Sequence, residues 1–327
     1  MRKITMEAAI TEALMEERAR DSGLVIFGDN STTGAGMMNH TAFDQAYPDN
    51  VVNMPVTESM YSNVAVGMAL AGLRPIAEFD FQDFMSLGFD GMVNEAAKVR
   101  FWSRGKVNLP IVFMSAGGVL AGLGCNHTQQ VESWFSNVPG LKICIPSTAA
   151  DTKGLLKTAI RDNDPVVFLF NRCLAYVADV VPEDEYTVPM GKARIHRQGT
   201  DVSIVCWHSA FVYTMELVDA LEKAGISCED ALKVEPMRIC SPRTAVPSGE
   251  SEFRAMLKRS DIAAGVFKIM GREMTDDPIF TAPNGPADFF AFTGSEVYDA
   301  KNPSGNSKDG DGKDSPDGFL SGPSVFA

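Results

Sequence analysis

The sequence predicts a doubly wound α/β fold, in which helices cover both faces of a parallel sheet, followed by a second, smaller α/β domain. Apolar runs without polar alternation recur along the first half, and longer segments with helical periodicity separate most of them. Such runs are typical of strands that are buried on both faces of a parallel sheet. They lie at 24–27, 51–54, 74–79, 109–114, 141–145 and 165–170. With 327 residues, the chain is long enough for about two domains.

Composition and charge argue against several classes of function. Hydrophobic residues make up 45% of the chain and charged residues 22%, which is ordinary for a soluble globular protein. The net charge of −13 argues against a nucleic-acid partner and against binding to an anionic membrane. No apolar run approaches the length of a membrane span, and residues 1–21 carry acidic side chains where a signal peptide would be apolar. We therefore expect a cytoplasmic protein, or a mature organellar one.

The cysteines indicate a reducing compartment. None of the six stands in a C-x-x-C pair, and several lie inside apolar runs. Buried thiols are therefore expected rather than a disulfide framework or a zinc site.

The helices are predicted from apolar side chains that recur with helical spacing. Four longer helices and one shorter helix follow this pattern in the first half. They are expected at 3–20, 42–47, 59–72, 84–102 and 149–161. Two loops rich in small residues, 28–40 and 115–124, each follow a predicted strand, which is where ligands bind in open parallel sheets.

The second half is less regular. A strand is predicted at 201–207, a helix at 209–224, a helix at 251–258 and a strand at 262–269. Residues 301–318 are of low complexity, and the Gly-Asp-Gly at 310–312 within them is interpreted as part of a solvated tail. The expected organisation is a first domain at 1–175, a linker at 176–199, a second domain at 200–275 and an irregular, partly disordered tail at 276–327.

Two titratable residues follow predicted strands and are candidates for catalysis. Glu58 lies between the strand at 51–54 and the next helix, and His127 follows the Gly-rich loop after the strand at 109–114. Both are therefore expected at the carboxyl edge of one sheet, where a histidine can transfer protons near neutral pH. The alternatives are a glutamate that favours the helix dipole and a histidine that caps the following helix.

Aromatic side chains gather after the strand at 74–79. Phe79, Phe81 and Phe84 either form the wall of a pocket for an apolar ring or belong to the core. The chain contains no P-loop, HExxH or GxSxG motif, and His40, His196 and His208 lack the spacing of metal ligands.

Several long segments, in the same order, resemble the β subunits of thiamine-diphosphate-dependent 2-oxo acid dehydrogenases and acetoin dehydrogenases. The resemblance covers roughly residues 1–230. These segments are most similar in sequence to the acetoin dehydrogenase branch, with the pyruvate dehydrogenase branch second. The segments are TESMYSNVAVGMALAGLRPIAEF, FDGMVNEAAKVRF, GLGCNHTQQ, PGLKICIPSTAADTKGLLKTAIRDNDPVVF and EYTVPMGKARIHRQGTDVSIV. The resemblance implies a transketolase-like pyrimidine-binding domain at the N-terminus.

The resemblance also implies roles for individual residues. Glu58 matches the glutamate that hydrogen-bonds the aminopyrimidine of thiamine diphosphate and activates it, and His127 matches a histidine that meets the substrate. Asp80 and Phe84 fall beside the pyrimidine ring. A potassium ion is implied by four further positions, mainly through their backbone carbonyls. These are Ala159, Ile160, Asp162 and Asp164.

The implied assembly divides the active site between two chains. In the family, the α subunit of an α2β2 heterotetramer holds the diphosphate and Mg²⁺, and a lipoyl-bearing acyltransferase accepts the product. The expected activity is cleavage of acetoin, or decarboxylation of a 2-oxo acid such as pyruvate, with transfer of the two-carbon unit to a lipoyl group. The alternatives are a non-catalytic structural or regulatory paralogue and a split transketolase-type enzyme.

The sequence departs from the family pattern at several places. Asn30, Asp80, Met114 and the pair Phe170-Asn171 stand where the family usually has Asp, Met, Arg and Leu-Glu. The histidine loop has Asn126 and Thr128 on either side of the histidine, in place of Gln and Ser. After residue 229 the family pattern is delayed by an insertion of about ten residues, and its closing segment is absent beyond residue 269.

Overall fold

The first half of the chain forms one parallel sheet of six strands. The computed structural model describes residues 2–29, 40–119, 123–228 and 258–281. Within them the strand order is β3-β2-β4-β5-β7-β6, and every neighbouring pair is parallel. The strands are β2 (Leu24–Gly28), β3 (Val51–Asn53), β4 (Arg74–Phe79), β5 (Val112–Gly117), β6 (Lys142–Cys144) and β7 (Val166–Asn171). All six lie at predicted positions, to within a few residues at their ends.

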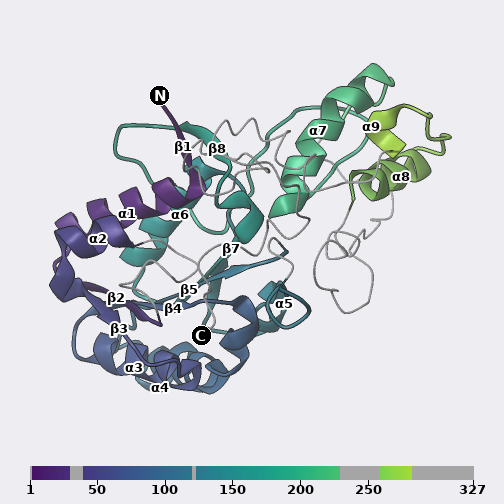
Figure 1. Ribbon diagram of the computed structural model, residues 1–327. Helices are drawn as coiled ribbons and strands as arrows, with labels where there is room; N and C mark the ends of the chain where they lie inside the picture. The colour runs from purple at the N-terminus through teal and green to yellow at the C-terminus, as the bar shows by residue number, and fades with distance from the viewer. Residues whose placement is uncertain (1, 30–39, 120–122, 229–257, 282–327) are drawn as a thin grey trace, which may run out of the picture.

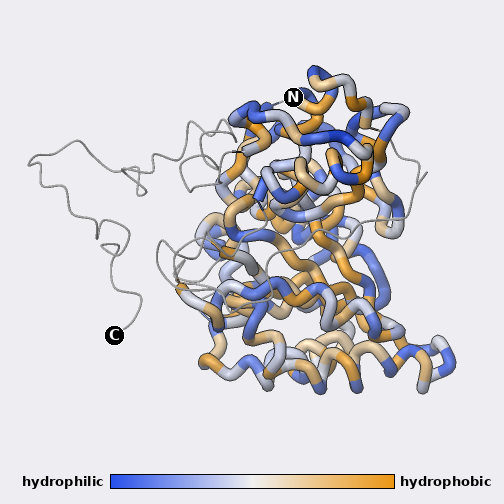
Figure 2. The backbone as a smooth tube through the Cα atoms, turned by 90° about the vertical axis from the view of Figure 1, so that its right-hand side faces the viewer, coloured by the Kyte–Doolittle hydropathy of each residue, from blue (hydrophilic) through white to orange (hydrophobic). Residues whose placement is uncertain are grey.

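Helices cover both faces of this sheet, so the predicted doubly wound arrangement is confirmed. Helices α1 (Met6–Arg20) and α6 (Ala149–Arg161) lie on one face, and α3 (Glu58–Leu70) and α4 (Ala97–Trp102) lie on the other (Figure 1). Successive side chains of a strand point to opposite faces, and each face has its own apolar core. In Figure 2 the strands of the sheet are largely orange, whereas blue segments lie mostly at the outer surface.

Shorter elements connect these layers. They are α2 (Thr41–Ala46), α5 (Glu132–Phe135) and the 3-10 helices η1 (Pro48–Asn50), η2 (Gln82–Ser86) and η4 (Arg172–Leu174). No described helix has the length and apolar character needed to span a membrane.

The single long helix predicted at 84–102 is wrong. The segment begins as the 3-10 helix η2 and continues, after a turn, into the π-helix η3 (Gly91–Ala96) and then α4. Close contact with α3 explains the change, because a Cβ on Gly91 would lie only 2.4 Å from Oγ of Ser62. A π-turn of this kind is frequent near functional sites.

A second, two-stranded sheet joins the N-terminus to the segment after β7. Strand β1 (Arg2–Thr5) pairs antiparallel with β8 (Ala178–Val181). The first helix therefore begins at Met6 and not at residue 3, and Thr5 caps it by accepting a hydrogen bond from the backbone N–H of Ala8 at 3.2 Å. The segment 176–199, which we predicted as a linker, contains β8. This pairing joins residues far apart in sequence, so local periodicity does not reveal it.

The described part of the second region is helical. Helix α7 (Ser209–Lys223) confirms the helix predicted at 209–224, but the predicted strand at 201–207 is only an isolated parallel bridge from Val202 to Cys228. The predicted strand at 262–269 is a helix, α8 (Arg259–Ile269), because Ile262, Ala263, Val266 and Phe267 recur with helical spacing and are buried together. A short helix, α9 (Pro278–Thr281), follows. The Gly-Asp-Gly at 310–312 and nearly all of the predicted helix at 251–258 lie outside the described residues.

The cysteines are partly as predicted. Cys144, Cys173 and Cys228 are buried and Cys206 is half-buried, but Cys125 is exposed in the loop before His127. Each of these five has a free thiol, and Cys240 lies outside the described residues.

Candidate functional site

The predicted catalytic and cofactor-binding residues lie along the carboxyl edge of the sheet. Glu58 follows β3, Asp29 follows β2, Asp80 follows β4 and the loop to His127 follows β5. The strand order places β3, β2, β4 and β5 side by side. In parallel sheets this edge is where ligands bind.

Glu58 is the first residue of α3, and only 7% of it is exposed. Its carboxylate is favourably placed beside the positive end of the helix dipole, so the structure agrees with both interpretations of this residue. The helix start is fixed by Tyr61, one turn further on, which is fully buried. Oη of Tyr61 accepts from the backbone N–H of Thr57 at 3.3 Å and lies 3.0 Å from the carbonyl oxygen of Pro55 and 3.2 Å from Oδ1 of Asp29.

Tyr61 is a residue that sequence reasoning missed. Burial raises the pKa of its phenol, and the nearby carboxylate of Asp29 raises it further. The hydroxyl group therefore stays protonated and can donate a hydrogen bond to the loop before α3 or to the end of β2. It couples the position of Glu58 to the neighbouring strand.

Gly88 packs against the backbone of Glu58. A Cβ at this position would lie 3.0 Å from the ring of Phe79 and 3.2 Å from the carbonyl oxygen of Glu58. The missing side chain allows the turn after η2 to approach the start of α3. This contact links the glutamate to the segment that carries Phe84.

His127 lies against two aromatic rings. Its ring centroid is 4.6 Å from that of Phe81 and 5.1 Å from that of Phe84, both in edge-to-face geometry, and the two phenylalanine rings are 5.4 Å apart. Nδ1 of His127 is 3.1 Å from Oδ1 of Asn126. This contact fits an Nδ1–H that donates to Asn126, which leaves Nε2 free to accept a proton.

The aromatic residues divide between the core and the edge of the sheet, and a pocket wall formed by Phe81 and Phe84 stays a prediction. Phe79 is fully buried and belongs to the core on the α3 face, whereas Phe81 and Phe84 are half-buried beside His127. The alternative role of His127 as a helix cap is wrong, because the following helix α5 begins at Glu132, four residues beyond Thr128. Its ring instead packs on an apolar wall at the edge of the sheet.

Two residues of η2 hold the loop that carries His127. The carboxylate of Asp83 accepts from Nε2 of Gln129 at 2.7 Å and from the backbone N–H of Gln129 at 3.3 Å. Oε1 of Gln82 accepts from the backbone N–H of Val131 at 3.3 Å. Gln82 and Asp83 are both buried, and the bond from Val131 to Gln82 is enclosed, whereas the bonds from Gln129 to Asp83 lie at the surface end of the loop because Gln129 is exposed.

Arg172 supports the same loop from the other side. Its guanidinium group donates to the carbonyl oxygen of His127 at 3.1 Å and lies 4.9 Å from the centre of the Phe81 ring. Arg172 is almost fully buried in η4, directly after β7. Nothing in its sequence context distinguishes it from a surface arginine, and only the fold brings it to His127.

The predicted potassium ligands lie in the last turn of α6 and in the loop directly after it. The carbonyl oxygens of Ile160 and Asp162 both accept from Nη1 of Arg74, at 2.9 and 3.1 Å, and Lys142 contacts the carboxylates of Asp162 and Asp164 at 2.8 and 3.1 Å. The carbonyl oxygen of Ala159 accepts from the backbone N–H of Asp162 at 3.3 Å. The carbonyl and carboxylate oxygens of this segment thus face cationic side chains. Binding of a potassium ion here stays a prediction.

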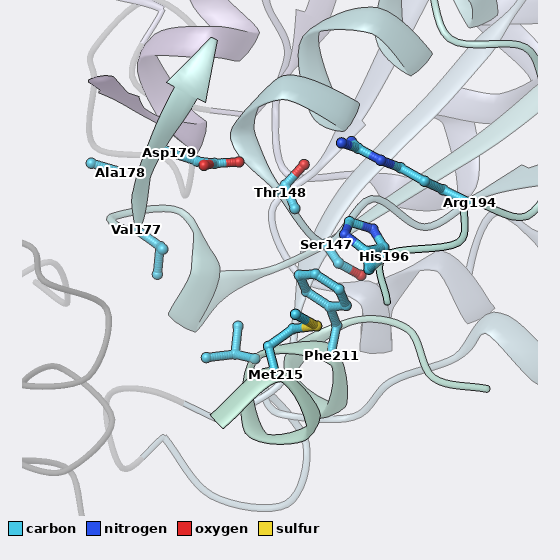
Figure 3. A pocket seen from close by; sticks show the side chains of 10 residues that line it. Ser147, Thr148, Val177, Ala178, Asp179, Arg194, His196, Phe211 and Met215 are labelled. Carbon is cyan, nitrogen blue, oxygen red and sulfur yellow. The ribbon is translucent and has the colours of Figure 1, made fainter. Parts of the chain in front are cut away.

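A separate cavity of about 320 Å³ lies between the first domain and the second region (Figure 3). Apolar side chains of α7 and polar groups, including Ser147, Asp179 and Arg194, line it together. The ring of His196 packs on Phe211 with centroids 4.4 Å apart. None of the predicted site residues lines this cavity.

Comparison with known proteins supports the family resemblance. Residues 2–176 match the pyrimidine-binding domain of transketolase. The chain is 38% identical over 234 residues to a mitochondrial pyruvate dehydrogenase E1 β subunit from rice, a match that spans 70% of this chain and 62% of that protein. It is 37% identical over 252 residues to the β subunit of an acetoin:2,6-dichlorophenolindophenol oxidoreductase from Cupriavidus necator, across 74% of this chain and 73% of that protein.

A solved structure shows a similar fold. The chain aligns with a protein described as a split-gene transketolase, an inactive β4 tetramer, with a TM-score of 0.57 at 22% identity. The alignment covers 69% of each chain. At this identity the likeness concerns the fold alone.

Proposed function

This chain belongs to the transketolase-like pyrimidine-binding family that includes the β subunits of pyruvate and acetoin dehydrogenases, and from that premise we propose that it supplies half of a thiamine-diphosphate-dependent active site. The observation that carries the proposal is the placement of Glu58, Phe84 and His127 along one edge of the sheet. The aligned region spans 62% of the rice relative. The activity of the whole enzyme is therefore part of the proposal.

The residues at this edge fit the pyrimidine end of thiamine diphosphate. A buried carboxylate at Glu58 can bind a ring N–H, and the half-buried ring of Phe84 offers an apolar surface to a flat ring. The absent side chain of Gly88 keeps Glu58 and the Phe84 segment close together. When bound, thiamine diphosphate supplies the electron sink for cleavage of a carbon–carbon bond.

Each side chain then has a limited task. Glu58 holds a proton on the ring nitrogen that it contacts, in an environment where burial strengthens the hydrogen bond. His127 accepts or donates a proton at Nε2 beside the reacting carbonyl. Phe81 and Phe84 exclude water from the histidine, and Arg172 and Asp83 keep its loop in place.

We propose that a second chain completes the site. An α subunit would hold the diphosphate and Mg²⁺ in an α2β2 heterotetramer, and a lipoyl group would accept the two-carbon unit. The substrate is proposed as acetoin, or a 2-oxo acid such as pyruvate. The similar identities to relatives of both kinds do not separate the two substrates.

The test compares two single substitutions in the reconstituted complex, one at Glu58 and one at a control position. The chain is co-expressed with the α-type chain, titrated with thiamine diphosphate, and assayed by dye reduction with acetoin and with pyruvate. We expect Glu58→Gln to lower turnover by about 10²–10⁴-fold while the complex still assembles. Glu273→Gln, at an exposed position, is the matched control and should leave turnover unchanged. Near-normal turnover in Glu58→Gln would contradict the assignment.

One observation favours a non-catalytic paralogue. The described part of the second region has helix α8 and an isolated bridge where strands were predicted. If wild-type chains form a complex without any effect of thiamine diphosphate on stability, this alternative is supported. A split transketolase-type enzyme would instead transfer its bound unit to a sugar phosphate.

A further inference from the structure

His208 has a backbone conformation that disfavours its own side chain. It directly precedes α7, with φ of 58° and ψ of −144°, and is 3% exposed. Glycine adopts such a conformation readily, whereas a residue with a Cβ is strained there. A bulky residue held in this conformation and fully enclosed points to a function of its side chain.

Two side-chain amides contact the imidazole of His208 at Nδ1 and share its one in-plane lone pair. Nδ1 is 3.1 Å from Nδ2 of Asn171 and also contacts Nε2 of Gln130. The orientation of Asn171 is fixed, because its Oδ1 accepts from the backbone N–H of Cys173 at 2.8 Å. The NH₂ group of Asn171 therefore faces His208, so Nδ1 is the acceptor and Nε2 carries the proton.

Burial keeps this imidazole neutral. It lowers the pKa of His208 to about 3, so the ring is uncharged at physiological pH. Nε2 of His208 has no hydrogen-bond partner within the described ranges of the chain. Among the residues that the structure describes, the hydrogen-bonding contacts of the ring are therefore made through Nδ1.

Both amides that contact His208 stand directly beside residues that hold the His127 loop, namely Gln129 and Arg172. Gln130 is three residues after His127 in the same loop, and Asn171 ends β7 immediately before Arg172. Arg172 donates to the carbonyl oxygen of His127. A second contact lies alongside, since Nε1 of Trp207 is 3.4 Å from Oε1 of Glu132.

We propose that His208 is a positioning residue that holds the His127 loop against the end of β7, by accepting hydrogen bonds from Gln130 and Asn171 at Nδ1. The second region thereby contributes to the candidate site without touching the substrate. The effect on catalysis rests on the proposed function of His127. The structural effect on the loop does not.

The first test is nitrogen NMR of the full-length chain with ¹⁵N-labelled histidine. The chain has four histidines, so single substitutions assign every ring. In the wild type, His208 should show an unprotonated Nδ1 and a protonated Nε2. In His208→Gly, which removes the acceptor and relieves the backbone, the ring signals of His127 and their pH titration should shift. His196→Gln, on the exposed segment beside Phe211, is the control and should leave the His127 signals unchanged.

A conservative variant separates positioning from packing. Asparagine keeps a Cβ at this position, and its side-chain oxygen can accept from the same amides. His208→Asn should therefore return the His127 signals toward those of the wild type. Equal effects of His208→Asn and His208→Gly, unchanged His127 signals in His208→Gly, or a protonated Nδ1 in His208 would each overturn the proposal.

The assembled enzyme provides the catalytic readout. We expect His208→Gly to lower kcat by about tenfold, with His208→Asn between it and the wild type. An unchanged kcat in His208→Gly would overturn the catalytic part of the proposal. If the proposed function is wrong, the complex of wild-type chains will show no turnover. The NMR experiment would still decide the role of His208 in that case.

Discussion

Asp83 and Gln129 join the two halves of the candidate site through a buried carboxylate. Asp83 precedes Phe84 in η2, and Gln129 follows His127 by two residues. Both the side-chain amide and the backbone N–H of Gln129 donate to Asp83. The segment that carries Phe84 and the loop that carries His127 are therefore joined by one anionic acceptor.

Removing this acceptor should weaken both the fold and the site. Asp83→Ala leaves two donors of Gln129 without their partner, and because Gln129 is exposed and can bind water instead, we expect the free energy of unfolding to fall by about 1 kcal/mol in urea titrations. Turnover of the assembled enzyme should fall with it. Asp90→Ala is the control, because Asp90 is exposed and bonds only Asn94 on a helix surface, and its effect should stay within about 0.5 kcal/mol. Equal losses in the two variants would mean that Asp83 does not hold the loop.

Gly88→Ala tests whether the close approach to Glu58 matters. The added Cβ meets the Phe79 ring and the Glu58 carbonyl, so we expect a loss of about 1–3 kcal/mol in the free energy of unfolding. Gly67→Ala is the matched substitution in α3, where a Cβ has no neighbour within 4 Å. It should stabilise the chain by about 0.4–1 kcal/mol. The prediction fails if chemical denaturation finds both variants equally stable.

The local sequence pattern predicts the strands of the sheet. It does not predict which distant parts of the chain contact one another. Buried strands such as β5 and β7 are continuous apolar runs, so the sequence alone predicts them. The pairing of β1 with β8 depends on residues far apart in the chain and has no local signal. The apolar run at 262–269 predicts a strand. In so short a segment, however, the spacing of its apolar residues fits the helix α8 equally well.

The same distinction applies to the candidate site. Glu58 and His127 were predictable because each follows a strand at the edge where ligands bind. Tyr61, Arg172 and His208 were not, since their importance comes from hydrogen bonds to other elements. Of these three, only His208 stands out by a local feature. That feature is its backbone conformation, which is visible in the structure and not in the sequence.

Potassium binding is testable without any partner chain. Each carbonyl oxygen has two lone pairs, so Ile160 and Asp162 can accept from Arg74 and still contact a cation. At equal ionic strength we expect a higher Tm in KCl than in NaCl, with a rise that saturates as the site fills. Equal Tm values in the two salts across the titration would exclude a stabilising potassium site in the isolated chain.

His40 and Glu78 make stability depend on pH. Nε2 of His40 is 2.7 Å from Oε2 of Glu78, and both side chains are buried. Burial disfavours the imidazolium, but attraction to Glu78, its hydrogen bond and the more distant Glu7 outweigh burial and raise the pKa of His40 above 6.5. The ion pair therefore contributes its full stability below the unfolded pKa of about 6.5 and loses it as pH rises through the raised folded pKa.

His40→Gln removes this titration while it keeps a hydrogen-bond donor for Glu78. The wild type should exceed the variant in free energy of unfolding by the largest margin at about pH 6, and the margin should shrink toward about pH 9. Urea titrations of both proteins across this pH range measure the difference in their free energies of unfolding. The contributions of the titrating groups that the two proteins share cancel in this difference. A margin that does not change with pH would mean that folding leaves the pKa of His40 unchanged, and a margin that grows with pH would mean that folding lowers it.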